Sequence, residues 1–126
     1  MSNDIGHEEK LVRAIAVKYI LDGEAEKAIR LLSRFYGVLE PKIKIGLPKK
    51  YKNALGCYDP KKKIIYLKSS AQYKDPFVVL HEFYHHLRSI TGKHRGTEKN
   101  ADRYALDSLR YYACLKDSIR NIEENI

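Results

Sequence analysis

His81, Glu82 and His85 form an HExxH pattern, in which two imidazoles are separated by one turn if the segment is helical. Positions i and i+4 of a helix share one face, so both histidines can reach a single metal ion. Glu82 would lie beside that ion without binding it, and its carboxylate could take a proton from a water held by the metal. The pattern therefore predicts a hydrolytic metal centre with two histidine ligands and a glutamate base.

A third ligand must lie outside this motif, because catalytic zinc usually has three protein ligands and keeps one position for water. Arg88 and Thr91 stand where the metzincin pattern HExxHxxGxxH requires Gly and His, so that class is excluded. Further along, Glu98 and Asp102 form an ExxxD pattern one helical turn apart. One of these carboxylates can bind zinc while the other accepts a hydrogen bond from a ligand histidine and orients it.

An HExxH helix followed by a glutamate helix with ExxxD resembles the gluzincin zinc metallopeptidases. The small size and the order of elements look like the minigluzincins, a minimal archaeal version of that fold, over roughly residues 41–116. The resemblance implies a zinc-dependent endopeptidase with Glu82 as general base and acid, and a short sheet whose edge strand holds the substrate extended. It implies these residues around the zinc: His81, His85 and Glu98 as ligands, with Asp102 supporting them.

His94 is the alternative third ligand. The run 93–96, Lys-His-Arg-Gly, is similar to the downstream histidine motif of SprT-like proteases, which act on proteins crosslinked to DNA. Arg95 interrupts the usual His-Gly pair, and this ligand set leaves the ExxxD pattern without a role. A loop histidine near the zinc could instead donate a hydrogen bond to an oxyanion. His86 directly follows the motif and points about 100° away on a helix, which favours packing or solvent.

The elements that must position these residues follow from the spacing of apolar side chains. An Asp75-Pro76 pair is typical of a helix start and places the HExxH motif in the middle of a helix. Small residues at 101 and 105 would let the last helix approach this one closely. The order is α-α-β-β-β-α-α, an α+β fold with these elements: helices 8–21 and 24–36, strands 42–45, 54–58 and 64–67, and helices 75–90 and 97 to at least 115.

The net charge of +8 lies in one stretch of the chain. Residues 41–70 contain nine lysines and a single acid, Asp59, whereas the other 96 residues carry 15 basic and 15 acidic side chains. Such a patch could bind nucleic acid, an acidic partner or an acidic part of the same chain. A lysine-covered sheet that deters edge pairing explains it equally well. A nucleic-acid- or partner-binding module is therefore the second interpretation of the chain.

Length and composition place the chain among small single-domain proteins. The 126 residues have ordinary globular composition, with no apolar run long enough to span a bilayer and no secretory signal, so a cytoplasmic location is expected. We expect one domain with these parts: N-terminal helices at 1–40, a lysine-rich sheet at 41–70, the HExxH helix at 75–91, the glutamate helix at 97–116 and an acidic tail at 117–126.

Further residues could act at the zinc site, although no sequence motif assigns them a role. Cys57 lies in an expected edge strand, where its thiolate could reach and block the zinc, although a small buried hydrophobe is the commoner role. The acidic tail could fold back over the cleft, as minigluzincins are described as latent forms obstructed by their own terminal segment, or it could be a fraying helix end. Self-inhibition and a homodimer are both open. Four tyrosines are conceivable oxyanion donors: Tyr58, Tyr104, Tyr111 and Tyr112.

Overall fold

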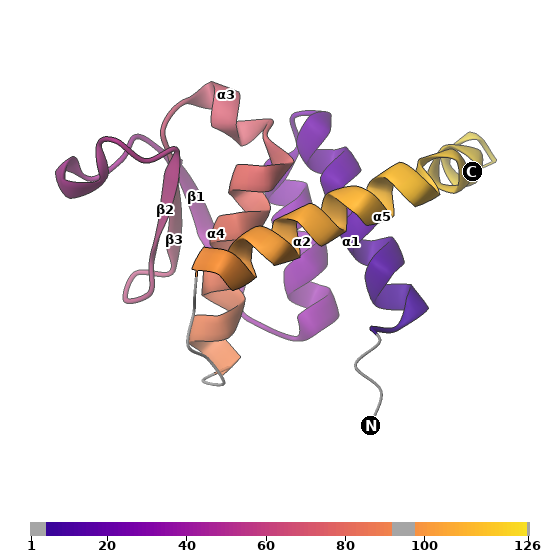
Figure 1. The fold of residues 1–126 in the computed structure, drawn as a ribbon, viewed down its shortest axis with the longest axis horizontal. Coiled ribbons are helices and arrows are strands. Elements are labelled where there is room, and N and C mark those ends of the chain that lie inside the picture. Colours follow the sequence, from indigo (N-terminus) through magenta and orange to yellow (C-terminus); the bar gives the residue numbers. More distant parts are fainter. Residues whose placement is uncertain (1–4, 92–97, 126) are drawn as a thin grey trace.

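The computed structural model describes residues 5–91 and 98–125 and confirms the α+β fold (Figure 1). Two N-terminal helices precede a three-stranded mixed sheet, and two long helices follow it. Two short pieces are added to the predicted order, a 3₁₀ turn at Lys49–Tyr51 and the short helix α3. The elements are α1 (His7–Leu21), α2 (Ala25–Tyr36), β1 (Lys42–Ile45), β2 (Gly56–Asp59), β3 (Ile64–Leu67), α3 (Ser70–Tyr73), α4 (Pro76–Thr91) and α5 (Glu98–Glu124).

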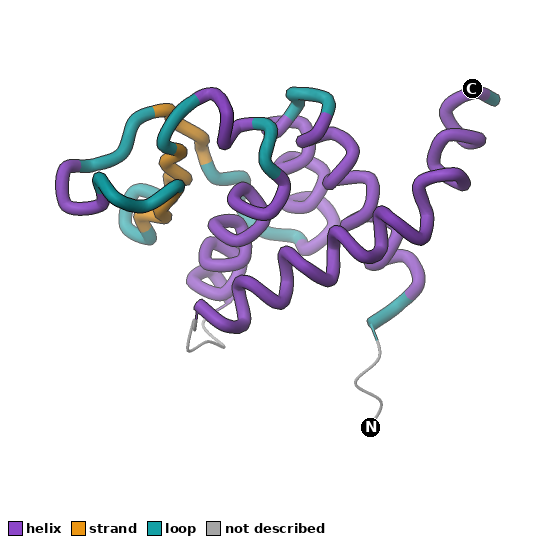
Figure 2. Tube along the Cα trace, turned by 45° about the horizontal axis from the view of Figure 1, so that its top comes forward, coloured by secondary structure: helices purple, strands orange, loops and turns teal. Residues whose placement is uncertain are grey.

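The sheet has the order β1-β3-β2, so β2 is an edge strand. It pairs antiparallel with β3, which pairs parallel with β1. Alternate residues of a strand face opposite sides of the sheet. Ile65 and Leu67 belong to the buried core with α4, whereas Tyr66 between them is only half-buried. Figure 2 shows the strands gathered at one end of the molecule, away from the C-terminus.

The start of β2 differs from the prediction. The strand begins at Gly56 rather than at Ala54, because the Ala54 N–H closes a turn on the carbonyl of Tyr51. Gly56 lies tightly against α4: a Cβ there would be 3.0 Å from Val78 Cγ1 and 3.3 Å from Glu82 Cγ. The absence of a side chain at this position therefore lets the edge strand approach the HExxH helix.

Helix α4 begins as its sequence predicts. The Asp75 carboxylate accepts hydrogen bonds from the backbone N–H groups of Phe77 (3.0 Å) and Val78 (3.4 Å). These bonds satisfy donors that the first turn of a helix leaves unpaired, and the proline at the first position needs none. The predicted start is thus confirmed.

Helix α3 was not predicted, although its sequence carries a signal. Ser69 Oγ accepts from the N–H of Ala71 and donates to the Gln72 side chain at 2.7 Å. A serine followed three residues later by Gln is typical of a helix N-terminus. The short turn connects β3 to α4.

Helix α5 packs along both α4 and α1, as Figure 1 shows. Ala101 and Ala105 are fully buried, and α5 contacts α4, as expected for small residues on a packed face of the last helix. No helix in the described ranges is both long and apolar enough to span a membrane.

The described part of the acidic tail continues α5 to Glu124 and lies away from the HExxH helix. Ile119 is buried, and the Glu123 carboxylate lies 3.6 Å from Lys18 Nζ of α1. The described part of the tail thus continues α5 away from the cleft, with Glu123 beside Lys18 of α1, and is not folded over the cleft (Figure 1).

Arg13 is a charged side chain inside the helical layer. It is 5 % exposed, and its guanidinium lies 3.9 Å from the centre of the Tyr104 ring. Its Nε donates to Ser108 Oγ at 2.9 Å and its Nη2 to the Tyr104 carbonyl at 2.8 Å. These bonds join α1 to α5, the helix that carries Glu98.

Arg13→Met should lower the free energy of unfolding by about 2–4 kcal/mol, because two buried acceptors lose a charged donor. Denaturant unfolding measures the difference. The control is Arg30→Met, which removes an exposed arginine of α2 paired with Glu40 and should change stability by at most about 0.5 kcal/mol. Equal effects of the two substitutions would contradict the role given to Arg13.

Candidate metal centre

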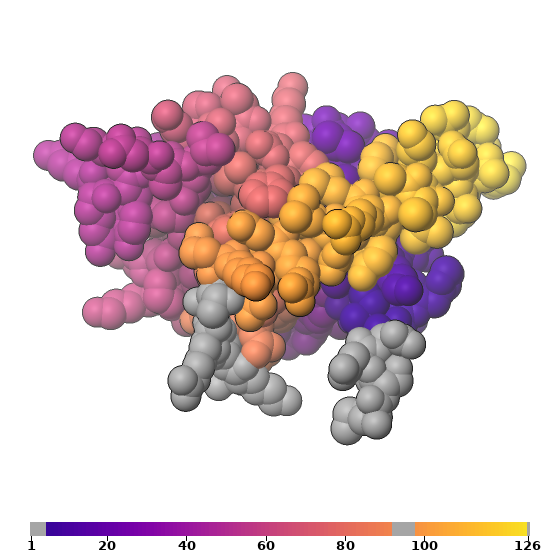
Figure 3. All heavy atoms as spheres, viewed as in Figure 1, coloured from indigo at the N-terminus to yellow at the C-terminus, as the bar shows by residue number. Residues whose placement is uncertain are grey.

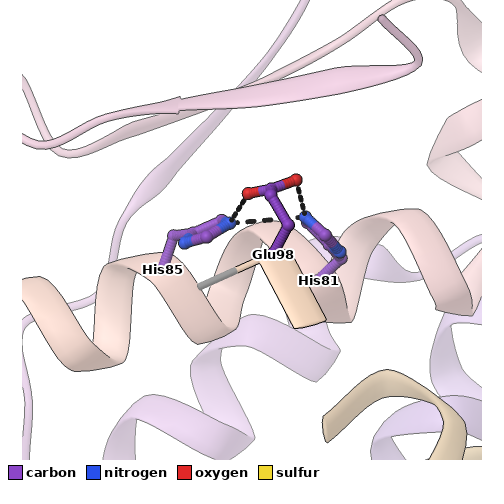
Figure 4. A group of neighbouring side chains, drawn as sticks. All are labelled: His81, His85 and Glu98. Atoms are coloured by element: carbon purple, nitrogen blue, oxygen red, sulfur yellow. Dashed lines mark hydrogen bonds and ion pairs between the residues drawn. The ribbon is translucent and has the colours of Figure 1, made fainter. Parts of the chain in front are cut away.

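Three potential ligands converge where α4 meets the start of α5. His81 Nε2 and His85 Nε2 are 3.3 Å apart, as expected for positions one helical turn apart. Glu98 presents one carboxylate oxygen to each ring, at 3.0 Å from His81 Nε2 and 2.7 Å from His85 Nε2 (Figure 4). One potential ligand atom of each residue lies within 4.8 Å of those of the other two, so the three side chains could bind a single metal ion.

The dimensions and chemistry of this group suit zinc. Two ligands on a tetrahedral zinc with bonds of 2.0–2.1 Å lie about 3.3 Å apart, close to the separation of the two imidazole nitrogens. The group found among residues 5–91 and 98–125 has two nitrogens and one carboxylate oxygen, a donor set typical of a catalytic zinc that keeps one position for water. The Glu98 side chain is 77 % exposed, so the group faces solvent on the side of α5.

Asp102 contacts the far side of the His81 ring. Its Oδ1 is 2.9 Å from Nδ1, while Nε2 of the same ring points toward Glu98. A neutral His81 ring that donates its Nδ1 proton to this carboxylate would keep the Nε2 lone pair for a metal, which is the tautomer that a ligand histidine needs. The ExxxD pattern thus places one carboxylate among the potential ligands and the other behind a ligand.

Asp102→Ala should weaken zinc binding by about 10–100-fold, because the His81 ring loses the acceptor that fixes its tautomer and orientation. Competition with a chromogenic zinc chelator measures the affinity. Asp107→Ala, on the same helix but paired with Arg110, should leave the affinity unchanged. The same affinity in wild type and Asp102→Ala would remove the orienting role.

Glu82 lies beside the three potential ligands but outside the group. It is 7 % exposed, and its Oε2 is 3.9 Å from His81 Nε2. Burial raises the pKa of this carboxyl to about 7, with the nearby Glu98 carboxylate acting in the same direction and His81 opposing it. The side chain is packed against Gly56 of β2, which limits its movement.

A cleft of about 550 Å³ connects the group to the edge of the sheet. Strand β2 forms one wall with Gly56, Cys57 and Tyr58, and Glu82 and His85 lie on the opposite side. The cleft therefore gives an extended molecule access both to the sheet edge and to the candidate metal centre.

His86 has a structural role whose partners, Leu39 and Tyr58, its sequence position did not reveal. The ring is fully buried; Nε2 lies 2.7 Å from the Leu39 carbonyl and Nδ1 2.6 Å from the Tyr58 hydroxyl. A carbonyl only accepts, so Nε2 donates to it, and in the neutral ring Nδ1 accepts from Tyr58. Burial lowers the pKa of His86, which favours the neutral ring. The expectation of packing, rather than metal binding, agrees with this arrangement.

The four tyrosines considered as oxyanion donors differ in whether they line the cleft. Tyr58 lines the cleft, but its hydroxyl is held by His86. Tyr104 is buried and bonded to Tyr36, so it is enclosed among the helices, and neither Tyr111 nor Tyr112 belongs to the described lining of the cleft. Tyr51, which was not among the tyrosines considered, also lines it.

Cys57 lies in the cleft wall but is not part of the ligand group found among residues 5–91 and 98–125. Burial raises the pKa of its thiol, and the Glu82 carboxylate raises it further, so the protonated form is favoured at neutral pH. His94, the alternative third ligand, lies outside the described residues.

Comparisons of the chain with protein-family models, curated proteins and solved structures gave no match. What supports a metal centre is therefore the arrangement of the chain's own residues. That arrangement is a candidate His81–His85–Glu98 site, with the identity of the ion open.

Proposed function

We propose that this chain is a zinc-dependent endopeptidase. The observation that carries the proposal is the convergence of His81, His85 and Glu98 beside a cleft, which His85 and Glu98 line together with the buried Glu82. Three ligands leave a position open, whereas a structural zinc is normally closed by four protein ligands, often cysteines. The donor set thus favours catalysis over a purely structural metal.

Zinc bound to these residues would supply a Lewis acid for a substrate carbonyl and lower the pKa of a coordinated water. Glu82 is the residue that accepts the proton from the attacking water and passes it to the leaving amine. Its place next to His81, within reach of the site but not among the ligands, suits this transfer. Asp102 keeps the His81 ring in the tautomer that exposes Nε2 to the metal.

A peptide is the substrate class that fits the cleft best. Strand β2 is an edge of the sheet and forms one wall of the cleft. An extended peptide can pair with such an edge through its backbone, which gives affinity independent of side chains. Pairing there would carry the scissile bond past Glu82 and the ligand group.

Metal removal tests this function. Protein stripped with a chelator should lose hydrolysis of a quenched fluorescent peptide library, and one equivalent of zinc per chain should restore it. Magnesium should not restore it, because this ion prefers oxygen ligands in octahedral geometry. Hydrolysis that persists in zinc-free protein, or no hydrolysis of any peptide by zinc-loaded protein, would refute the proposal.

A further inference from the structure

The excess positive charge of the chain lies on the sheet end of the molecule. Nine lysines of residues 41–70 form what we term the lysine surface, and Figure 3 shows this segment, in magenta, at the end opposite the C-terminus. All but Lys63, which is half-buried, are exposed. The lysine surface consists of Lys42, Lys44, Lys49, Lys50, Lys52, Lys61, Lys62, Lys63 and Lys68.

The lysine surface has few neighbouring acids. Some basic side chains of the helices form ion pairs, as in Lys18 with Asp22 and Lys27 with Glu24. Within residues 5–91 and 98–125, no ion pair involves a member of the lysine surface. Asp59, the one acid of this segment, accepts hydrogen bonds from the backbone N–H groups of Lys61 and Lys62. Nine lysines against this single carboxylate leave an excess of positive charge for an external acidic group.

Part of the lysine surface lies next to the candidate metal centre. A second hollow, of about 390 Å³, is lined by Lys50, Lys61 and Lys62 together with Asp59 and Tyr66, so its lining carries three bases and one acid. It shares four wall residues with the metal cleft: Tyr51, Cys57, Tyr58 and Pro60. The lysine-lined hollow and the metal cleft thus adjoin along strand β2, whose Cys57 and Tyr58 line both.

This placement matters because side chains of an extended peptide alternate in direction. In a peptide paired along β2, one set of side chains would face the metal cleft and the other set the lysine-lined hollow. Resting on the proposed function, we propose that the substrates are acidic peptides, whose Asp or Glu side chains are bound by Lys50, Lys61 and Lys62.

A protein segment fits this surface better than a nucleic acid. Stacking of bases needs free aromatic faces, and one of the tyrosines of the hollow is already covered, since Lys50 Nζ lies 5.1 Å from the centre of the Tyr51 ring. Residues 41–70 also contain no arginine, the side chain best suited to bind phosphate bidentately and to stack on bases. Edge pairing along β2 additionally requires a peptide backbone.

Binding of labelled peptides tests the proposal without requiring turnover. Zinc-loaded Glu82→Gln protein would be titrated with three extended peptides of equal length, rich in Glu, Gln or Lys, and followed by fluorescence anisotropy. The Glu-rich peptide should bind most tightly. In the added triple variant Lys50→Gln/Lys61→Gln/Lys62→Gln its affinity should fall about tenfold, the sum of three modest charge contacts. Raising the salt should remove the preference.

The matched control removes the same charge from exposed helical positions, in Lys27→Gln/Lys116→Gln/Arg120→Gln, and should bind as the parent does. Charge reversal of the three hollow lysines to Glu should shift the preference to the Lys-rich peptide. Equal binding of Glu- and Gln-rich peptides, or equal losses in the two triple variants, would overturn the proposal. A single-stranded oligonucleotide that binds more tightly than the Glu-rich peptide would overturn it in favour of nucleic acid.

The proposed function can fail independently of this inference. If the Glu-rich peptide binds through the hollow lysines but zinc-loaded wild type does not hydrolyse it or any other peptide, the acidic-peptide surface stands and the peptidase proposal is refuted. If wild type hydrolyses peptides without preferring acidic ones, the inference is refuted and the peptidase proposal stands.

Discussion

Glu82→Gln is expected to bind zinc as wild type does and to hydrolyse peptides at least about a thousandfold more slowly, within the range that general acid–base catalysis contributes. Gln has nearly the shape of Glu, so it fills the same buried space against Gly56. Its amide cannot accept the proton of the attacking water. The ligand group does not include Glu82, so the metal should remain.

Two measurements on the same preparation check this result: zinc per chain by elemental analysis, and the rate of peptide hydrolysis under single-turnover conditions. A chelator competition then gives the zinc affinity. The control is Glu24→Gln, an exposed glutamate before α2 that pairs with Lys27 and should leave both values unchanged. Because burial already disfavours the charged carboxylate of Glu82, the neutral amide should not lower stability.

Full activity of Glu82→Gln would refute Glu82 as the base, even if zinc were required. Loss of both zinc and activity would place Glu82 among the ligands instead, and the assignment of Glu98 would then need revision. Retained zinc with lost activity is the combination that the geometry favours, because the two functions belong to different residues of one cleft.

The parts of the centre that depend on local sequence could be predicted. The i, i+4 spacing of His81 and His85 fixes their shared face once the segment is helical, and Asp75 with the following proline fixes the helix. The separation of Glu98 and Asp102 by four residues similarly places both carboxylates on the side of α5 that faces His81. Within one helix, the fixed geometry turns residue spacing into spatial arrangement.

Contacts between distant segments could not be predicted. His86 is held by Leu39 and Tyr58, which lie 47 and 28 residues away, and no local pattern indicates this pairing. Arg13 likewise sits among apolar residues of α1, and its partners on α5 are more than 90 residues further along the chain. Such pairs become favourable only when tertiary packing removes both partners from water.

The start of β2 shows a second reason why part of the structure could not be predicted from the sequence. Ala54 and Leu55 fit a strand by composition, yet a turn closed by the Tyr51 carbonyl ends just before Gly56. Propensity for strands is weak compared with packing, and here the close approach of Gly56 to α4 decides where pairing begins.

Substitution of a single ligand is the second change with a large expected effect. His81→Ala and Glu98→Ala should each weaken zinc binding by more than about a hundredfold, since loss of an outer hydrogen-bond partner alone costs up to that factor. For Glu98 the reason is specific: its two carboxylate oxygens lie 2.7–3.0 Å from both imidazoles, so this one side chain bridges the pair.

Zinc per chain after dialysis against a zinc buffer measures the effect. His7→Ala is the matched control for His81→Ala, because it removes an exposed histidine outside the ligand group. Glu124→Ala serves in the same way for Glu98→Ala, since it removes an exposed acid near the other end of α5. Both controls should retain one zinc, and circular dichroism should show that all variants keep their helices.

His94→Ala decides between the two ligand sets. If Glu98 is the third ligand, His94→Ala should keep its zinc while Glu98→Ala loses it, and an oxyanion role for His94 would appear only as slower hydrolysis. The opposite pattern would assign the third position to His94 and leave Glu98 as an exposed acid beside the site. The contacts of Glu98 favour loss of zinc in Glu98→Ala and not in His94→Ala. Its two carboxylate oxygens contact His81 and His85 separately, and a residue that only begins α5 does not require these contacts.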